Sequence, residues 1–250
     1  MFVEPSFLTS ASLNSIGGLA RCLGEKGYET AFFHGAENGS MGFEAFSRGS
    51  GFKHYYGRTE YDACPEFNGE EDFDGLWAIW DEPFLQYFGL TMSRELHEPF
   101  MTAVFTASSH HPFHIPEQYQ GTFAEGVLPM HKCIRYLDYS LRRFFEYART
   151  QPWYEHTLFV ITGDHTNQSC QERYQTDLGL YCVPVIFFDP THQTFEPQRR
   201  HAIAQQIDVM PTLLHAVGYA DPYCLWRRPA CHTTLADVGH QLQQRHLSIC

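Results

Sequence analysis

The sequence lacks any long apolar run. Nowhere do about 20 apolar residues follow one another, which is the length that a membrane-spanning helix needs. The first residues, MFVEPSFLTSAS, also lack the basic start and the apolar stretch of a signal peptide. We therefore expect no membrane span and no export signal in these 250 residues.

Basic side chains are scarce. The chain has 17 Lys and Arg against 29 Asp and Glu, which gives a formal net charge of -12. A negative surface repels the phosphate backbone of nucleic acids and the surface of an anionic membrane. Nucleic acid is therefore not an expected partner, although a local basic pocket stays possible.

Paired cysteine motifs are missing as well. None of the eight cysteines forms a CxxC pair, so neither a zinc ribbon nor a dithiol redox motif is indicated. We predict free, buried thiols. What the chain does have is 43% hydrophobic and 16% aromatic residues, enough for the core of one domain. Residues 227–250 lack periodicity, and we expect a weakly structured tail there.

Hydrophobic periodicity predicts helices and strands that alternate along the chain. Helical spacing occurs at 13–27, 130–149 and 205–219, and short apolar runs typical of buried strands occur at 30–35, 100–107, 157–162 and 183–190. Parallel strands need crossover connections, so this order predicts a three-layer α/β/α sandwich with a mostly parallel central sheet. Residues 57–88 interrupt the pattern and are expected to form an excursion over the sheet edge, with a helix start at DEPFLQYF.

Candidate functional residues follow three of these strands. His34 ends the first, His110 follows the second, and Asp164 and His165 follow the third in LFVITGDHTN. Ligands of such sheets gather beyond the carboxyl ends of the strands, so we expect these four side chains to converge. A carboxylate beside a neutral imidazole suits Mn²⁺, Zn²⁺ or Mg²⁺. The alternative is that Asp164 and His165 only cap the following turn.

Five stretches together resemble a known family. They are, in order, GYETAFFHGAENGSMGF, FTASSHHPFHIP, LFVITGDHTN, YCVPVIFFDP and QQIDVMPTLLHAVGY. Over residues 12 to about 223 the chain resembles the sulfatase-like branch of the alkaline phosphatase superfamily, of the lipoteichoic acid synthase or phosphoglycerol transferase type. The resemblance implies an alkaline phosphatase-like fold, with residues 1–226 as a sulfatase-like catalytic domain.

The resemblance also implies roles for single residues. Asp164 and His165 would be metal ligands, usually to Mn²⁺, and His34 and His110 would bind substrate, with His111 as a bystander. A threonine or serine would attack the phosphate ester and form a covalent phospho-enzyme.

The nucleophile-bearing segment of the family is expected to lie upstream of this chain. Thr9 is the candidate that the sequence itself offers, together with Ser10, but both suit the cap of the first helix better. Glu4 is a still weaker match to the acidic ligand of the family.

Several residues at the expected substrate pocket differ from those of the lipoteichoic acid synthases. Ala36, Met41 and Phe43 stand where that group has an acidic residue, a tryptophan and an arginine, so a different substrate is expected. No cysteine shows the C/S-x-P-x-R pattern of formylglycine sulfatases, which disfavours sulfate-ester hydrolysis by that route. The Trp77 and Trp80 rings could form a sugar-binding platform, but packing against the sheet is the preferred interpretation.

The expected function is metal-dependent phosphoryl or phosphoglycerol transfer, or hydrolysis of a phosphoester or sulfuric-ester-like bond. The partner would be a phosphorylated or sulfated small molecule, lipid headgroup or glycan of the cell envelope. By resemblance the parent protein is membrane-anchored with an extracytoplasmic domain. The alternatives are a truncated, non-catalytic fragment and a module that binds a phosphorylated ligand without reacting.

Overall fold

The computed structural model describes residues 17–166, 168–199 and 204–223. Thr9, Ser10, Glu4 and the tail 227–250 lie outside the described residues. Contacts divide the chain into two compact units. The described part of the first unit is 23–154, and that of the second is 17–22 together with the described residues after 154.

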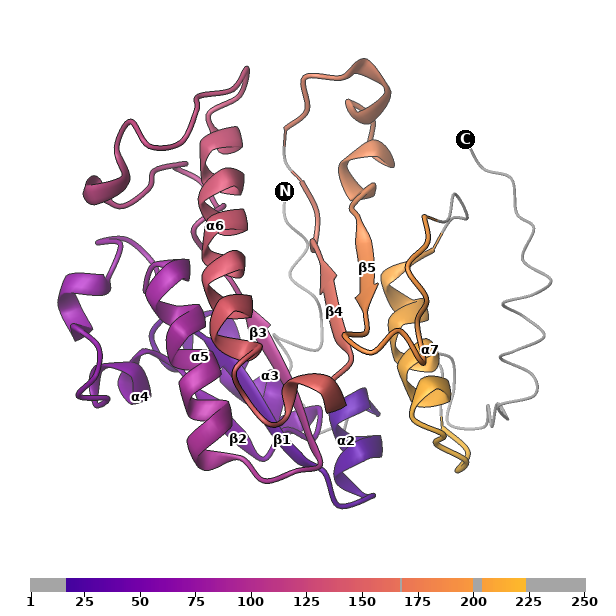
Figure 1. The fold of residues 1–250 in the computed structure, drawn as a ribbon. Helices are drawn as coiled ribbons and strands as arrows, with labels where there is room; N and C mark the ends of the chain where they lie inside the picture. Colours follow the sequence, from indigo (N-terminus) through magenta and orange to yellow (C-terminus); the bar gives the residue numbers. More distant parts are fainter. Residues whose placement is uncertain (1–16, 167, 200–203, 224–250) are drawn as a thin grey trace. The chain divides into compact units, whose positions relative to one another are not determined.

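The first unit is built on a parallel sheet of three strands in the order β2-β1-β3 (Figure 1). The strands are β1 (Glu29–His34), β2 (His54–Tyr56) and β3 (Phe100–Phe105). Both neighbours run parallel to β1, as the alternating pattern predicts, because helices occupy the connections between them. His34 is opposite Phe105 in the register, so the carboxyl ends of β1 and β3 lie side by side.

Strand β1 forms the centre of the core, because aromatic side chains cover both of its faces. On one face Phe33 is fully buried and its ring lies 4.6 Å from that of Tyr56 and 4.7 Å from that of Phe88. On the other face Phe32 contacts the rings of Phe52 and Tyr55 at 5.4 and 6.0 Å. Successive side chains of a strand point to opposite faces of the sheet, so neighbouring aromatic residues of β1 pack on both faces.

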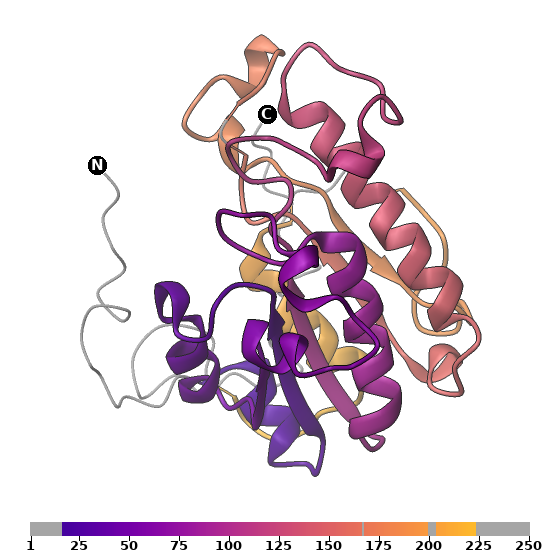
Figure 2. The ribbon, with the colours of Figure 1, turned by 90° about the vertical axis from the view of Figure 1, so that its left-hand side faces the viewer.

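Helices α5 (Asp81–Glu95) and α6 (Met130–Ala148) pack against each other beside this sheet (Figure 2). The helix predicted at 130–149 is confirmed, and the helix start predicted at DEPFLQYF extends to Glu95. Gly89 permits the close approach, because a Cβ there would meet the Tyr147 ring at 2.9 Å. The Phe88 and Phe144 rings stack at 5.3 Å across the same contact.

The excursion predicted at 57–88 is shorter in the structure, because α5 begins at Asp81, and residues 57–80 return to the end of β1. Its short elements are α4 (Arg58–Asp62) and the 3-10 turn η2 (Gly69–Asp72). The Arg58 guanidinium lies 3.8 Å from the centre of the Phe73 ring, and Ala36 forms a bridge with Ala78. The remaining elements of this unit are η1 (Ser40–Gly42), α3 (Phe43–Gly49), η3 (Glu117–Tyr119) and the start of η4 (Tyr154–His156).

The second unit contains a separate strand pair, β4 (Phe159–Thr162) and β5 (Val185–Phe188), and this pair is antiparallel. The prediction of parallel strands therefore holds for the sheet of the first unit and not for this pair. The described residues that connect the two strands form only the 3-10 turns η5 (Glu172–Tyr174) and η6 (Gly179–Tyr181). Without a crossover helix the chain turns back and β5 runs against β4.

Two shorter helices were also predicted. The one at 205–219 is confirmed as η7 (Gln206–Asp208) followed by α7 (Val209–Ala216), where Pro211 is tolerated because the first turn needs no N–H donor. The one at 13–27 is observed as α2 (Leu19–Gly24), and its described start is later than predicted. Glycines at 17 and 18 precede it, and glycine disfavours a helix. None of the described helices is long and apolar enough to cross a membrane.

The described cysteines are free thiols, as predicted, but only some of them are buried. Cys22 and Cys133 are buried, whereas Cys170 and Cys182 are exposed. The prediction of buried thiols is wrong for the last two, because they lie in the irregular connection between β4 and β5, which packs few side chains.

Asp189, directly after β5, organises the loop that follows. It is 3% exposed and accepts hydrogen bonds from the Thr191 hydroxyl and from the N–H groups of Thr191, Thr194 and Phe195. Burial alone would raise the pKa of this carboxyl, but the hydrogen bonds prevail and hold the pKa well below its usual value. The ionised form is therefore the one that stabilises the fold.

Replacement of Asp189 by asparagine is expected to lower the free energy of unfolding by about 1–3 kcal/mol at pH 7, because the amide group presents N–H donors to N–H donors. A carboxyl whose pKa is lower in the folded than in the unfolded state stabilises the fold at pH values above the unfolded-state pKa. The difference in stability between Asp189→Asn and the unmodified chain should therefore shrink as the pH falls below about 4. Thermal unfolding at pH 7 and pH 3 measures both effects. The exposed Asp138→Asn serves as the control and should change stability by less than about 0.5 kcal/mol.

Candidate functional site

His34 ends β1 inside an aromatic enclosure. Its Nδ1–H donates to the Phe105 carbonyl at 3.0 Å, and its side chain is 0% exposed. Three rings surround it at centroid distances of 4.7, 5.2 and 5.4 Å, namely Phe43, Phe105 and Trp77. Burial lowers the pKa of His34, which the bond to Phe105 only partly offsets. The ring is therefore neutral near pH 7, and its Nε2, which has no hydrogen-bond partner among the described residues, can only accept.

His110 lies on the exposed turn that follows β3. Its N–H donates to the Ala107 carbonyl at 3.0 Å, which closes the turn. Its Nδ1 lies 2.9 Å from the His111 carbonyl, and since a carbonyl only accepts, this nitrogen carries the hydrogen. The Nε2 of His110 is then the nitrogen that can meet a ligand.

Trp77 brings the two histidines to one place. Its indole ring lies 5.4 Å from the His34 ring and 4.9 Å from the His110 ring. The sequence predicts that the first two strands bring His34 and His110 together at their carboxyl ends. In the structure both rings contact the same tryptophan. Their role in binding substrate stays a prediction.

A tight loop presents Trp77. The Asp74 Oδ1 accepts the N–H groups of Leu76, Trp77 and Ala78 at 2.8, 2.6 and 3.1 Å. A backbone hydrogen bond also links the two ends of the loop, because the Asp74 N–H donates to the Ala78 carbonyl at 3.0 Å. The loop is therefore closed by its own hydrogen bonds, and Trp77 is held at a fixed position over the end of the sheet.

Gly35 lets this loop come close to β1. The Ile79 N–H donates to the Gly35 carbonyl at 2.9 Å, and a Cβ on Gly35 would lie 3.3 Å from that nitrogen. A larger residue would push the loop away from the strand. A glycine directly after His34 thus leaves room for the loop that carries Trp77.

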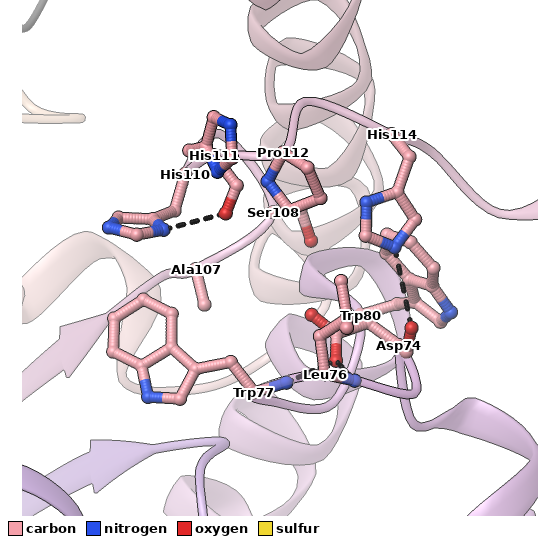
Figure 3. Close-up of a pocket in the computed structure, with 10 residues that line it drawn as sticks. All are labelled: Asp74, Leu76, Trp77, Trp80, Ala107, Ser108, His110, His111, Pro112 and His114. Carbon is pink, nitrogen blue, oxygen red and sulfur yellow. Dashed lines mark hydrogen bonds between the residues drawn. The ribbon is translucent and has the colours of Figure 1, made fainter.

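Trp77, Asp74 and His110 line a small pocket, whereas the buried His34 does not (Figure 3). Trp77 and His110 lie on the same side of it, and His114 lies on the opposite side, where its Nε2 is 3.3 Å from the Asp74 carbonyl. The full lining comprises Asp74, Leu76, Trp77, Trp80, Ala107, Ser108, His110, His111, Pro112 and His114. The pocket is aromatic and rich in imidazole, which suits a ligand with both apolar and hydrogen-bonding parts.

Sequence reasoning missed part of this pocket. His114 is not among the candidate residues of the sequence analysis, and His111 is expected there to be a bystander, yet both line the pocket. Trp77 and Trp80 pack against the fold, as the preferred interpretation of the sequence predicts. Both also line the pocket. The repeated histidines of SSHHPFH were an available signal for His114. Nothing in the sequence pattern indicates Asp81, whose carboxylate holds the backbone of Ala107 and Ser108.

Asp164 and His165 follow β4 in the second unit, and both side chains are exposed, by 57% and 50%. The Asp164 Oδ1 accepts the N–H of His165 at 2.7 Å, which is the turn-capping role considered as the alternative. The Asp164 Oδ2 lies 3.5 Å from the His165 Nε2. Capping therefore uses one carboxylate oxygen, and the second oxygen and the imidazole nitrogen point to a common place.

The distance between these two atoms can be compared with the spacing of two ligands on one divalent cation. Two donors that each lie about 2.1 Å from one ion, at an angle between roughly 90° and 110°, stand about 3.0–3.4 Å apart. The observed distance of 3.5 Å lies just above this range. In the described part of the chain no group of three or more His, Cys, Asp or Glu side chains could hold a metal ion, and binding of a metal by this pair stays a prediction.

The backbone around the pair is held from both sides. The Gln206 amide donates to the carbonyls of Gly163 and Asp164 at 2.7 and 2.8 Å, and the Thr166 N–H donates to the Leu180 carbonyl at 2.8 Å. The turn is therefore anchored although its side chains are exposed. His34 and His110 belong to the first unit and Asp164 and His165 to the second, and that all four face one another stays a prediction.

Solved structures with the same fold establish the class. The chain is similar to a protein in the alkaline phosphatase superfamily from Vibrio parahaemolyticus, with a TM-score of 0.69, 25% identity and coverage of 86% of this chain and 51% of that one. It is also similar in fold to the lipoteichoic acid synthase LtaP from Listeria monocytogenes, with a TM-score of 0.67, 20% identity and coverage of 90% and 56%. The protein is an α/β protein of the alkaline phosphatase superfamily.

The sequence profile of the Sulfatase family matches residues 5–219, and the chain belongs to this family. Lipoteichoic acid synthase 2 of Bacillus subtilis is 23% identical over 230 residues, which cover 86% of this chain and 34% of that protein. The lipoteichoic acid synthase of Staphylococcus saprophyticus is 26% identical over 208 residues, which cover 78% and 31%. The chain thus spans about a third of the length of these curated relatives. The predicted family and fold are confirmed.

Proposed function

We propose that this protein acts on a phosphoester of an envelope lipid headgroup or glycan, by phosphoryl or phosphoglycerol transfer or by hydrolysis. The relatives named lipoteichoic acid synthase support this class of reaction. The observation that carries the proposal is the exposed pair of Asp164 and His165, whose second carboxylate oxygen and imidazole nitrogen lie 3.5 Å apart. By the same resemblance, the site of action is the outer side of the membrane.

Asp164 and His165 would hold a divalent cation, Mn²⁺ first, with Zn²⁺ and Mg²⁺ as alternatives. A cation bound there would withdraw charge from a phosphate oxygen and so favour attack on phosphorus. The carboxylate supplies negative charge, and the neutral imidazole supplies a nitrogen donor. Gln206 anchors the carbonyl groups of the turn and thereby keeps both side chains on a fixed backbone.

His34 and His110 would bind the substrate. His34 is neutral and can only accept a hydrogen bond at Nε2, so it suits a hydroxyl group better than a phosphate oxygen. His110 is exposed and could meet the phosphate when it is protonated. The two imidazoles around Trp77 therefore suit a ligand that carries both groups.

The substrate differs from that of the lipoteichoic acid synthases in this proposal. Phe43 packs 4.7 Å from the His34 ring, at the position where the resemblance implies an arginine. An aromatic ring there offers apolar surface in place of a positive charge. We therefore propose that a less charged part of the substrate lies beside His34.

The attacking hydroxyl would come from the part of the chain outside the described residues, where Thr9 is the candidate within this sequence, or from a preceding segment. A second candidate function is a module that binds a phosphorylated ligand without reacting. The small number of metal donors favours this module. The described residues bring together only two donors, whereas Mn²⁺ prefers about six.

Calorimetric titration and a turnover assay test the proposal. We expect the 250-residue chain to bind Mn²⁺ and to bind glycerol phosphate more tightly in its presence. Hydrolysis of a p-nitrophenyl phosphodiester, dependent on Mn²⁺, would support the enzyme, and binding of both ligands without turnover would support the binding module. Absence of Mn²⁺ binding would contradict the enzyme, and absence of glycerol phosphate binding would contradict the binding module.

A further inference from the structure

Asp81 is a buried carboxylate that joins two segments of the first unit. It is the first residue of α5 and only 2% exposed. Its Oδ1 accepts the N–H groups of Ala107 and Ser108 at 2.8 and 3.1 Å, and the Ser108 Oγ accepts the Asp81 N–H at 2.9 Å. Three hydrogen bonds therefore fix the start of α5 to the first residues after β3.

The turn that carries His110 starts at the same place. Ala107 gives its N–H to Asp81 and accepts the N–H of His110 at its carbonyl, at 3.0 Å. The His110 carbonyl in turn accepts the N–H of Phe113 at 3.1 Å. The Ser108 N–H, which donates to Asp81, and the Ala107 carbonyl, which accepts from His110, belong to one peptide group, so a movement of this group is passed to His110.

Asp81 also ends the segment that carries Trp77. Ile79, two residues before Asp81, is bound to the Gly35 carbonyl, and Trp77 contacts the His110 ring at 4.9 Å. The relative position of Trp77 and His110 thus depends on the backbone at Asp81 and on its bonds to the turn.

The hydrogen bonding of Asp81 is not that of an ordinary helix cap. Its Oδ1 bonds go to residues 26 and 27 positions later in the chain. Its Oδ2 is buried and has no partner among the described residues. Burial raises the pKa of this carboxyl to about 6, although the bound N–H groups act against the shift. A buried, half-satisfied carboxylate costs stability, so local stability is a poor explanation for it.

We propose that Asp81 is a positioning residue, which holds the turn of residues 107–110 so that His110 stays beside Trp77 and presents its Nε2 to the substrate. The part of this inference that concerns substrate rests on the proposed function. The part that concerns the geometry of His110 does not.

The test uses the full 250-residue chain, labelled with ¹³C at the histidine ring, and glycerol phosphate as the probe. Asp81→Ala is expected to shift the His110 ring resonance and to weaken probe binding by at least about tenfold. Asp81→Asn keeps the acceptor oxygen and should restore the resonance, with binding within about threefold of the unmodified chain. The His110 resonance is assigned with His110→Gln.

Asp189→Ala is the matched control, because Asp189 is also a buried aspartate that accepts several backbone N–H groups. It should lower stability while leaving the His110 resonance and probe binding unchanged. A merely structural role of Asp81 would give the same result as this control.

A folded Asp81→Ala variant with unchanged His110 resonance would overturn the inference. So would an Asp81→Asn variant whose His110 resonance and probe binding stay like those of Asp81→Ala. If Asp81→Ala does not fold, Ser108→Ala decides: it removes the hydroxyl that accepts the Asp81 N–H, keeps the Ser108 N–H that donates to Asp81, and should still shift the His110 resonance. An unshifted resonance in that variant overturns the inference. If the unmodified chain does not bind glycerol phosphate but Asp81→Ala still moves His110, the proposed function fails and the positioning role stands.

Discussion

Replacement of Asp164 by alanine is expected to weaken Mn²⁺ binding by at least about 100-fold, since even the loss of an outer partner of a metal ligand costs 10–100-fold. The substitution removes one of the two proposed donor groups, and the carboxylate is the one of the two that carries a negative charge. The side chain is 57% exposed, so the fold should survive its loss. Calorimetric titration with MnCl₂ measures the change.

Asp177→Ala is the matched control for this prediction. Asp177 is an exposed aspartate in the same connection between β4 and β5, and its loss should leave Mn²⁺ affinity unchanged. His165→Ala should weaken binding as Asp164→Ala does, because it removes the second donor. Equal Mn²⁺ affinity of Asp164→Ala and the unmodified chain would show that the pair only caps its turn.

Replacement of Phe33 by alanine should lower the free energy of unfolding of the first unit by about 3–5 kcal/mol, the usual cost of truncating a buried phenylalanine. Phe33 is 0% exposed in the central strand, and its ring packs between those of Tyr56 and Phe88. Its removal leaves a cavity that a three-stranded sheet held by helix packing cannot easily close. Denaturant unfolding followed by tryptophan fluorescence reports on this unit, which contains Trp77, Trp80 and Trp153.

Phe32→Ala provides the comparison, because Phe32 is the preceding residue of the same strand but is only partly buried. We expect it to cost at least about 1 kcal/mol less than Phe33→Ala, because less apolar surface is lost. Equal losses in the two variants would mean that the face of β1 with Phe33 is not the better-packed one.

The sequence by itself determined the elements whose pattern is local. An apolar run followed by histidine defines β1 and the place of His34, and helical spacing defines α6 and α7, since backbone geometry imposes these periods on neighbouring residues. The family followed from five ordered stretches and is confirmed. The position of Asp164 and His165 directly after β4 was likewise fixed by the order of residues.

Only the tertiary structure decided which distant segments meet. The antiparallel pairing of β4 and β5 depends on a connection without a crossover helix, which strand patterns do not reveal. Trp77 reaches His34 and His110 because Gly35 admits its loop, and Asp81 finds its hydrogen-bond donors 26 and 27 residues away. Such contacts depend on packing between segments far apart in the chain, and local periodicity carries no information about them.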